Sequence, residues 1–147
     1  MTFPDSWLLD TNLLIYASIA QFPDHLLARR RLKEFEARGA QLWISPQVIR
    51  ELIAVLTRPN YFNPPIARQT ALSIAEAYSQ HYQMLPETRE VLDQLLALLR
   101  TVPHQGRKIH EVKLAATAVQ HGIGGILTVN GRDFAAFDNL LRIESLI

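Results

Sequence analysis

The stretch Trp7-Leu8-Leu9-Asp10 and the residues that follow it decide the fold class of this chain. Three apolar residues that end at an acid are typical of a short buried strand, and residues 12–20 then predict a helix. The same alternation recurs along the chain. Further strands are predicted at residues 41–44, 82–85, 125–129 and 141–143, and further helices at residues 24–38, 45–57, 66–79, 87–100 and 109–121. This order predicts an α/β fold with a central parallel sheet of about four or five strands, covered by helices on both faces.

Length and composition are those of one ordinary domain, and we expect a single domain over residues 1–147. The chain is 48% hydrophobic and contains no cysteine, which excludes disulfides, thiol catalysis and cysteine-based zinc sites. No apolar stretch approaches the length of a membrane helix, and the N-terminal sequence MTFPDSW does not resemble a secretory signal. We therefore expect a cytoplasmic protein. The net charge of +1 leaves the type of partner open.

Two glutamates lie at positions where a solvated charge is unusual. At helical spacing, Glu51 shares its face with apolar residues, and so does Glu111. The companions of Glu51 are Val48, Leu52 and Val55, and those of Glu111 are Leu114, Ala115 and Ala118. Both glutamates are therefore expected to lie at least partly buried.

Two aspartates follow predicted strands. Asp10 ends the first strand, and Asp133 comes shortly after the strand at residues 125–129. The two can meet only if these strands are neighbours in the sheet. That adjacency would place them in the crevice at the carboxyl ends of the strands, where such sheets bind ligands.

Each of these acids taken alone could form a salt bridge, with Arg50, Lys113 or Arg132 as candidate partners. Four together lack a matching set of inward basic residues. Like charges about 4 Å apart repel by about 4 kcal/mol at an effective dielectric constant of 20, and a domain is stable by only about 5–15 kcal/mol. Either some of the acids are protonated or a cation lies among them. Oxygen ligands favour Mg²⁺ or Mn²⁺, and such a site suits metal-assisted phosphoryl transfer.

Four segments of the chain carry a resemblance to a known family. They are Leu8–Ala17, Ile44–Leu52, His110–Ala118 and Thr128–Phe134, and Leu56–Pro59 adds to them. In this order and spacing they resemble the acidic motifs of the PIN-domain ribonucleases, in particular the VapC-like toxins of prokaryotic toxin–antitoxin modules. The likeness spans essentially the whole chain.

The resemblance implies a PIN-like three-layer α/β/α sandwich and Mg²⁺- or Mn²⁺-dependent endoribonuclease activity on RNA. It also implies inhibition by a cognate antitoxin protein, and homodimers are common in this family. Carried over by position, the catalytic and metal-binding residues are Asp10, Glu51, Glu111 and Asp133. We expect Glu51 to act through metal-bound water and the other three to bind the ion directly.

Several neighbouring residues are expected to support this acidic site. Four polar side chains are candidates for orienting the carboxylates, although capping or turn roles are the commoner use of such residues. They are Thr11, Asn12, Thr128 and Asn130. Arg107, Lys108 and His110 precede Glu111 and are candidates for RNA contact.

Three features leave alternatives open. The family usually has aspartate where this chain has Glu111, which leaves room for a catalytically attenuated or silent PIN-like module that binds RNA or protein. The basic run at residues 29–33 is more typical of a solvated face that pairs with Glu34 and Glu36. Tyr61 and Phe62 could stack on bases or could seal the core or a dimer interface, and we favour the second interpretation. A phosphorylation receiver module is disfavoured because residues 85–87 supply no phosphoacceptor aspartate.

Overall fold

A computed structural model describes residues 2–146 of the chain. Its centre is a sheet of five parallel strands in the order β3-β2-β1-β4-β5. The strands are β1 (Ser6–Leu9), β2 (Gln41–Ile44), β3 (Gln83–Met84), β4 (Gly125–Thr128) and β5 (Arg142–Ser145). The prediction of a parallel α/β sheet with four or five strands is confirmed.

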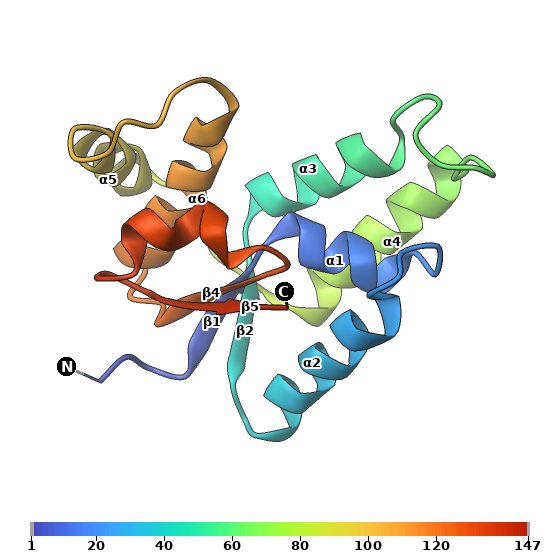
Figure 1. Cartoon of the computed structure of the whole chain (residues 1–147), viewed down its shortest axis with the longest axis horizontal. Coiled ribbons are helices and arrows are strands. Elements are labelled where there is room, and N and C mark those ends of the chain that lie inside the picture. The colour runs from blue at the N-terminus through green and yellow to red at the C-terminus, as the bar shows by residue number, and fades with distance from the viewer. Residues whose placement is uncertain (1, 147) are drawn as a thin grey trace.

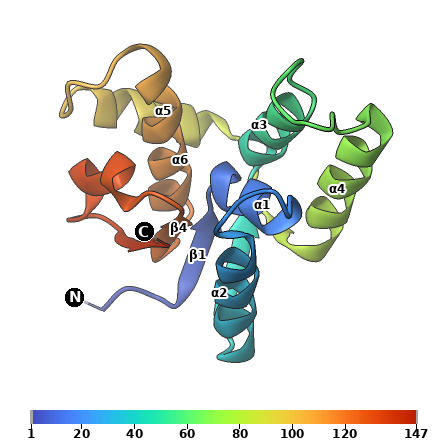
Figure 2. The same ribbon diagram turned by 45° about the vertical axis from the view of Figure 1, so that its right-hand side comes forward.

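Helices flank this sheet on two sides (Figures 1 and 2). On one side lie α1 (Thr11–Ser18), α2 (His25–Ala37), α3 (Pro46–Leu56) and α4 (Arg68–His81). On the other side lie α5 (Arg89–Leu99), α6 (Ile109–Gln120) and the short 3₁₀ helix η2 (Gly131–Phe137), while η1 (Gly106–Lys108) leads directly into α6. No helix within residues 2–146 is long and apolar enough to cross a membrane.

The core lies around the central strands, as expected for a parallel sheet that is covered on both faces. Trp7, Leu8 and Leu9 of β1 and Ile126 and Leu127 of β4 are all buried. The two strands pair directly, with Leu9 opposite Leu127. Their carboxyl ends therefore meet at one edge of the sheet, which fulfils the condition for Asp10 and Asp133 to approach each other.

A glycine makes the close pairing of these strands possible. A Cβ added at Gly125 would lie 2.6 Å from the indole ring of Trp7 and 2.5 Å from the carbonyl oxygen of Arg142. Real Cβ atoms do not approach other atoms this closely, so any side chain at this position would force β1, β4 and β5 apart. The glycine that begins β4 thus permits the close pairing of β4 with both of its neighbouring strands.

Element boundaries depart from the sequence predictions mainly near prolines and caps. The helix expected at residues 66–79 begins at Arg68 and continues to His81, because Ala67 is still extended (φ −59°, ψ 139°) after the two prolines of the preceding loop. The helix expected from Glu87 begins at Arg89, because the hydroxyl of Thr88 accepts a hydrogen bond from the amide of Val91 and caps it. Glu87 instead forms ion pairs.

Candidate active site

Asp10 is fixed at the junction of β1 and α1. As the N-cap residue of α1, it accepts a hydrogen bond from the Thr11 amide to Oδ1 at 2.7 Å. Its Oδ2 accepts a hydrogen bond from the hydroxyl of Thr128, at the end of β4, at 2.8 Å. Both carboxylate oxygens are thus oriented by the neighbouring strand end and by the start of α1.

Burial and neighbouring charge make Asp10 a weaker acid than usual. Desolvation raises the pKa of Asp10 from 3.8 to about 6, and the negative charges of Glu51 and Asp133 act in the same direction. The hydrogen bonds from Thr128 and Thr11 favour the charged form and oppose this shift in the pKa of Asp10. A positive charge beside Asp10 would offset both the cost of burying its carboxylate and the repulsion from Glu51 and Asp133.

Glu51 lies on α3 and is held by two donors. The hydroxyl of Thr11 donates to its Oε2 at 3.1 Å, and Nε2 of Gln47 donates to its Oε1 at 3.0 Å. Nε2 of Gln47 also donates to the carbonyl oxygen of His110 at 2.9 Å. Glu51 thus connects α3 to α1, and Gln47 connects α3 to the beginning of α6.

Glu111 and Asp133 complete the acidic side of the site from α6 and η2. Burial raises the pKa of Glu111, the charge of Asp133 raises it further, and the charge of Lys108 opposes the shift. Asp133 therefore interacts electrostatically with both Asp10 and Glu111. Within residues 2–146 neither the Glu111 nor the Asp133 carboxylate accepts a hydrogen bond.

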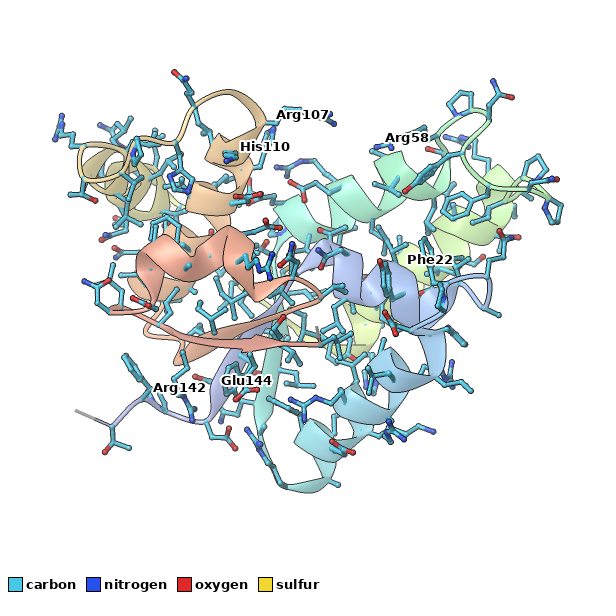
Figure 3. All side chains as sticks on the ribbon, viewed as in Figure 1. Phe22, Arg58, Arg107, His110, Arg142 and Glu144 are labelled. Atoms are coloured by element: carbon cyan, nitrogen blue, oxygen red, sulfur yellow. The ribbon has the colours of Figure 1, made fainter. Side chains whose placement is uncertain are left out.

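All four acids line one pocket of about 430 Å³. Arg107 and His110 also line it where η1 leads into α6, and Arg58 lines it just beyond the end of α3. Figure 3 shows Arg107 and His110 on one side of the molecule's upper face and Arg58 on the other. Lys108 is not among the lining residues, although its charge acts on Glu111. The remaining lining residues are Thr11, Asn12, Ile15, Ala54 and Val55.

The salt-bridge interpretation of the acids is wrong for all three of its candidate partners, because among residues 2–146 none of Arg50, Lys113 and Arg132 pairs with a pocket acid. Arg50 and Lys113 both bind Glu87, at 3.2 and 3.1 Å. In the part of the chain that the structure describes, none of the four pocket acids takes part in an ion pair. The four carboxylates consequently line the pocket without a direct ion pair, although Arg58 and Arg107 line it too.

The basic run at residues 29–33 behaves largely as the solvated-face interpretation predicts. Arg30 and Arg31 approach Glu34 at 4.0 and 3.5 Å, and Arg31 also binds Glu144 at 3.2 Å. Glu36, however, pairs with His81 of α4 at 3.0 Å. The run lies on α2, away from the lining of the acidic pocket.

The donor set of the pocket has the chemistry of a site for a hard divalent cation. Its candidate ligands are carboxylate oxygens, and burial, followed by the neighbouring negative charges, raises the pKa values of Asp10 and Glu111. As the side chains lie, no three acidic or histidine side chains of residues 2–146 are grouped closely enough to hold an ion. The four acids thus fit a divalent ion by residue type and charge, whereas their present spacing does not bring three of them around one point.

The four predicted supporting residues divide into two kinds. Thr11 and Thr128 donate to carboxylates of the pocket. Asn12 and Asn130 instead accept from backbone amides, of Val129 at 3.4 Å and of Arg132 at 3.2 Å. The Asn130 contact caps η2, so its observed role is the structural one considered as the alternative.

Sequence reasoning missed two residues of this site. Gln47 is buried (4% exposed) and bridges Glu51 to α6. Arg58 lines the pocket, whereas from the sequence it entered only as part of the Leu56–Pro59 stretch and was given no role at the site. A signal for Gln47 was present: it is a polar residue four positions before Glu51, which is one helical turn away on the same face.

Comparisons with known proteins identify the family. The family model described as "PIN domain" matches residues 7–140. The chain belongs to the PIN-domain family. Among curated proteins, the PIN domain described here is 27% identical over 130 residues to Ribonuclease VapC24 of Mycobacterium tuberculosis, a match covering 88% of this chain and 89% of the relative.

Solved structures of VapC proteins share the PIN fold of this chain. One is Mycobacterium tuberculosis VapC20, described as a toxin that cleaves the Sarcin-Ricin loop (TM-score 0.68, 18% identity, covering 88% of this chain and 93% of that one). Another is VapBC-1 from nontypeable Haemophilus influenzae (TM-score 0.70, 15% identity, covering 96% and 98%). A third is the DNA-bound VapBC of Salmonella typhimurium (TM-score 0.66, 23% identity, covering 99% and 100%).

Proposed function

We propose that this PIN-domain protein is a VapC-like toxin, an Mg²⁺- or Mn²⁺-dependent endoribonuclease that hydrolyses phosphodiester bonds of RNA. The observation that carries the proposal is the pocket lined by four acids with no neutralising ion pair among residues 2–146. The similarity to Ribonuclease VapC24 supports the same reaction class. The carboxylates of the four acids are the kind of ligand that a hard divalent cation prefers, and a bound cation would attract a phosphate of the RNA.

In this proposal the four acids have two different roles. Asp10, Glu111 and Asp133 would hold the ion directly, and Glu51 would act through water. When bound, a divalent ion supplies activation of water as nucleophile and stabilisation of charge on the phosphate. Thr128 and Thr11 keep the carboxylates of Asp10 and Glu51 turned toward the pocket through the bonds described above.

Basic residues at the rim are suited to guide the RNA. Arg107 and His110 line the pocket and are exposed, and Lys108 lies between them in sequence. We assign these three residues to contacts with backbone phosphates, which are sequence-independent and weaken as salt increases. Their position beside the acids would bring the scissile phosphate to the site.

The biological setting is part of the same proposal. We propose that the chain acts in the cytoplasm as one PIN-like domain, that a cognate antitoxin protein inhibits it, and that it forms homodimers. Support comes from solved structures with a similar fold, such as a toxin–antitoxin complex from Klebsiella pneumoniae (TM-score 0.67, 19% identity, covering 96% of this chain and 98% of that one).

The test of the proposed activity is RNA cleavage by the pure protein with Mn²⁺, compared with an Asp10→Asn variant. We expect Asp10→Asn to lower cleavage roughly 10³-fold, the scale on which loss of a charge-stabilising group acts. Chelation of the metal should abolish cleavage by the wild type. Equal RNA degradation by wild type and variant would refute the proposal, because the activity would then come from a contaminant.

A second candidate function, a catalytically attenuated or silent PIN-like binding module, is favoured by one residue. Glu111 is longer by a methylene than the aspartate usual in the family, and its carboxylate accepts no hydrogen bond among the described residues. Replacing it by the family residue, in Glu111→Asp, separates the two. A large gain in cleavage indicates an attenuated enzyme, whereas inactivity of both proteins with every divalent metal supports a binding module.

A further inference from the structure

Beyond the acidic pocket, the chain forms a second hollow that continues from it. This hollow, of about 290 Å³, shares Asn12, Ile15, Val55 and Arg58 with the acidic pocket. Its other lining residues are the aromatic side chains of Tyr16, Phe22 and Tyr61. We call it the aromatic slot. Because four residues line both spaces, a chain that passes the acids can enter the slot without leaving the surface.

Two stacked pairs of side chains form the slot. The rings of Tyr16 and Phe22 stack with centroids 4.5 Å apart and planes inclined by 14°. The guanidinium of Arg58 lies over the ring of Tyr61, 4.7 Å from its centroid. Figure 3 shows that Phe22 and Arg58 lie on the same side of the molecule. The slot therefore offers flat π surfaces together with a positive charge.

The structure divides the roles of the two adjacent aromatic residues in this loop. Phe62 is buried (7% exposed) and joins the core, as favoured from the sequence. Tyr61 is 45% exposed and lines the slot. Its ring meets that of Phe62 edge to face, with centroids 4.8 Å apart. Phe62 thus anchors the loop in the core, while Tyr61 stays partly exposed at the slot.

We propose that the aromatic slot is a nucleobase subsite, in which an unpaired base of the RNA beside the scissile phosphate inserts against Arg58 and Tyr61. The inference rests on the proposed ribonuclease function and specifies its substrate as an unstacked, single-stranded segment. Bases of single-stranded RNA stack on aromatic rings and on arginine planes, and the arginine charge favours the adjoining phosphate. A base paired within a duplex cannot present its face in this way.

Charge along the surface is consistent with this path for the RNA. Arg107 and His110 line one side of the acidic pocket, and Arg58 lies where the pocket meets the slot. Arg107 and Arg58 consequently place positive charge on both sides of the acids. A strand whose phosphate lies at the acids can place the next phosphate near Arg58 and its base in the slot.

The experiment measures binding rather than cleavage, so that it does not depend on the activity. The full chain carrying Asp10→Asn is titrated against two labelled probes in fluorescence anisotropy. One probe is a 12-nucleotide single-stranded RNA of randomised sequence, and the other is an abasic oligonucleotide with the same sugar–phosphate backbone. Tyr61→Leu and Tyr61→Phe are each added to Asp10→Asn, and Leu96→Ala on α5 is the control, because Leu96 is equally exposed at 48%.

We expect Tyr61→Leu to weaken binding of the base-bearing RNA about tenfold and to leave binding of the abasic probe unchanged. Tyr61→Phe retains the ring and should stay within about twofold of the parent. Leu96→Ala should change neither affinity. Arg58→Met should weaken both probes and reduce the slope of log affinity against log salt by about one, the signature of a lost phosphate contact.

Three results would overturn the subsite. They are no loss of affinity in Tyr61→Leu, an equal loss for both probes, or a change in the oligomeric state of Tyr61→Leu measured by light scattering. The last would assign this face to a second copy of the chain. Failure of the nuclease proposal looks different: RNA cleavage would not depend on Asp10, while base-dependent binding through Tyr61 would remain.

Discussion

The two halves of the acidic pocket differ in how their carboxylates are held. Asp10 and Glu51 each accept two hydrogen bonds, from Thr11 and Thr128 and from Thr11 and Gln47. The carboxylates of Glu111 and Asp133 accept none from residues 2–146. The first half is built on strand ends and on α3, while the second half comes from the first turn of α6 and from η2.

This difference separates placement by the fold from placement by a ligand. The first half is oriented by donors that the sheet brings together, at the cost of burying Asp10. The second half contributes charge, and Asp133 raises the pKa values of both Asp10 and Glu111. We infer that an ion would find Asp10 and Glu51 already oriented and would draw Glu111 and Asp133 toward it.

The largest expected effect concerns the stability of the first half in metal-free buffer. Folding raises the pKa of Asp10 from 3.8 to about 6, so the folded state binds the proton more tightly than the unfolded chain does. Stability attributable to this group is therefore lost as pH rises from about 4 to about 6. Asp10→Asn removes the free-energy cost of keeping this buried carboxylate ionised, and it should stabilise the protein above pH 6 by on the order of 3 kcal/mol.

Thermal unfolding in EDTA checks this expectation. At pH 8 the Asp10→Asn variant should melt roughly 5–10 °C above the wild type, and the two melting temperatures should converge only below the unfolded pKa of 3.8, where Asp10 is protonated in both states of the wild type. Added Mn²⁺ should then raise the melting temperature of the wild type more than that of the variant. A variant that is less stable at every pH would show that the carboxylate of Asp10 stabilises the fold.

The next effect tests the strand-end donor itself. Thr128→Val keeps the shape of the side chain but removes the hydroxyl that donates to Asp10 at 2.8 Å. We expect cleavage to fall about 10–100-fold, the range typical when a residue that orients a metal ligand is lost. Because this hydrogen bond lowers the pKa of Asp10, the acidic limb of the pH–activity profile should also move to higher pH.

A matched control is available in Thr117 of α6. It is as buried as Thr128 and its hydroxyl donates to the carbonyl oxygen of Lys113 at 2.9 Å, outside the pocket. Thr117→Val should therefore retain cleavage and the pH profile of the wild type. If both valine variants lose activity to the same extent, the effect of Thr128 is one of general stability rather than of orientation.

Much of the fold could be predicted from the sequence, because the patterns that determine its strands and helix caps are local. The strand at residues 41–44 and the cap at Ser45 lie as predicted, since an apolar run, a hydroxyl and a proline decide them within a few residues. The start of α4 was misplaced by two residues, because Ala67 is extended and is the N-cap of the helix, although it continues the apolar pattern.

The site was accessible only in outline. Glu51 and Glu111 were predicted because they share helix faces with apolar residues, and Asp10 and Asp133 because they follow strands. All four line the pocket. The slot was not predicted, because Phe22 and Tyr61 are 39 positions apart and no spacing rule connects them. Tyr61 and Phe62 have the same pattern in the sequence, and only the packing shows which one is buried.

The smallest expected effect concerns Gln47, which connects the two halves of the pocket. Gln47→Met removes the bonds to Glu51 and to the carbonyl of His110. It also removes a buried Oε1 that finds no partner among residues 2–146. Burying an unpaired acceptor is costly, so its removal offsets the lost bonds, and the free energy of unfolding should change by less than about 1 kcal/mol.

Cleavage should nevertheless fall about tenfold in Gln47→Met, because Glu51 loses a donor and the first turn of α6 loses its link to α3. Gln94→Met on α5, outside the pocket, is the control and should leave cleavage unchanged. Urea unfolding and steady-state cleavage of the same preparations separate the two effects. A loss of stability in proportion to the loss of activity would contradict this prediction. Gln47 would then act by stabilising the fold rather than by positioning the two halves of the pocket.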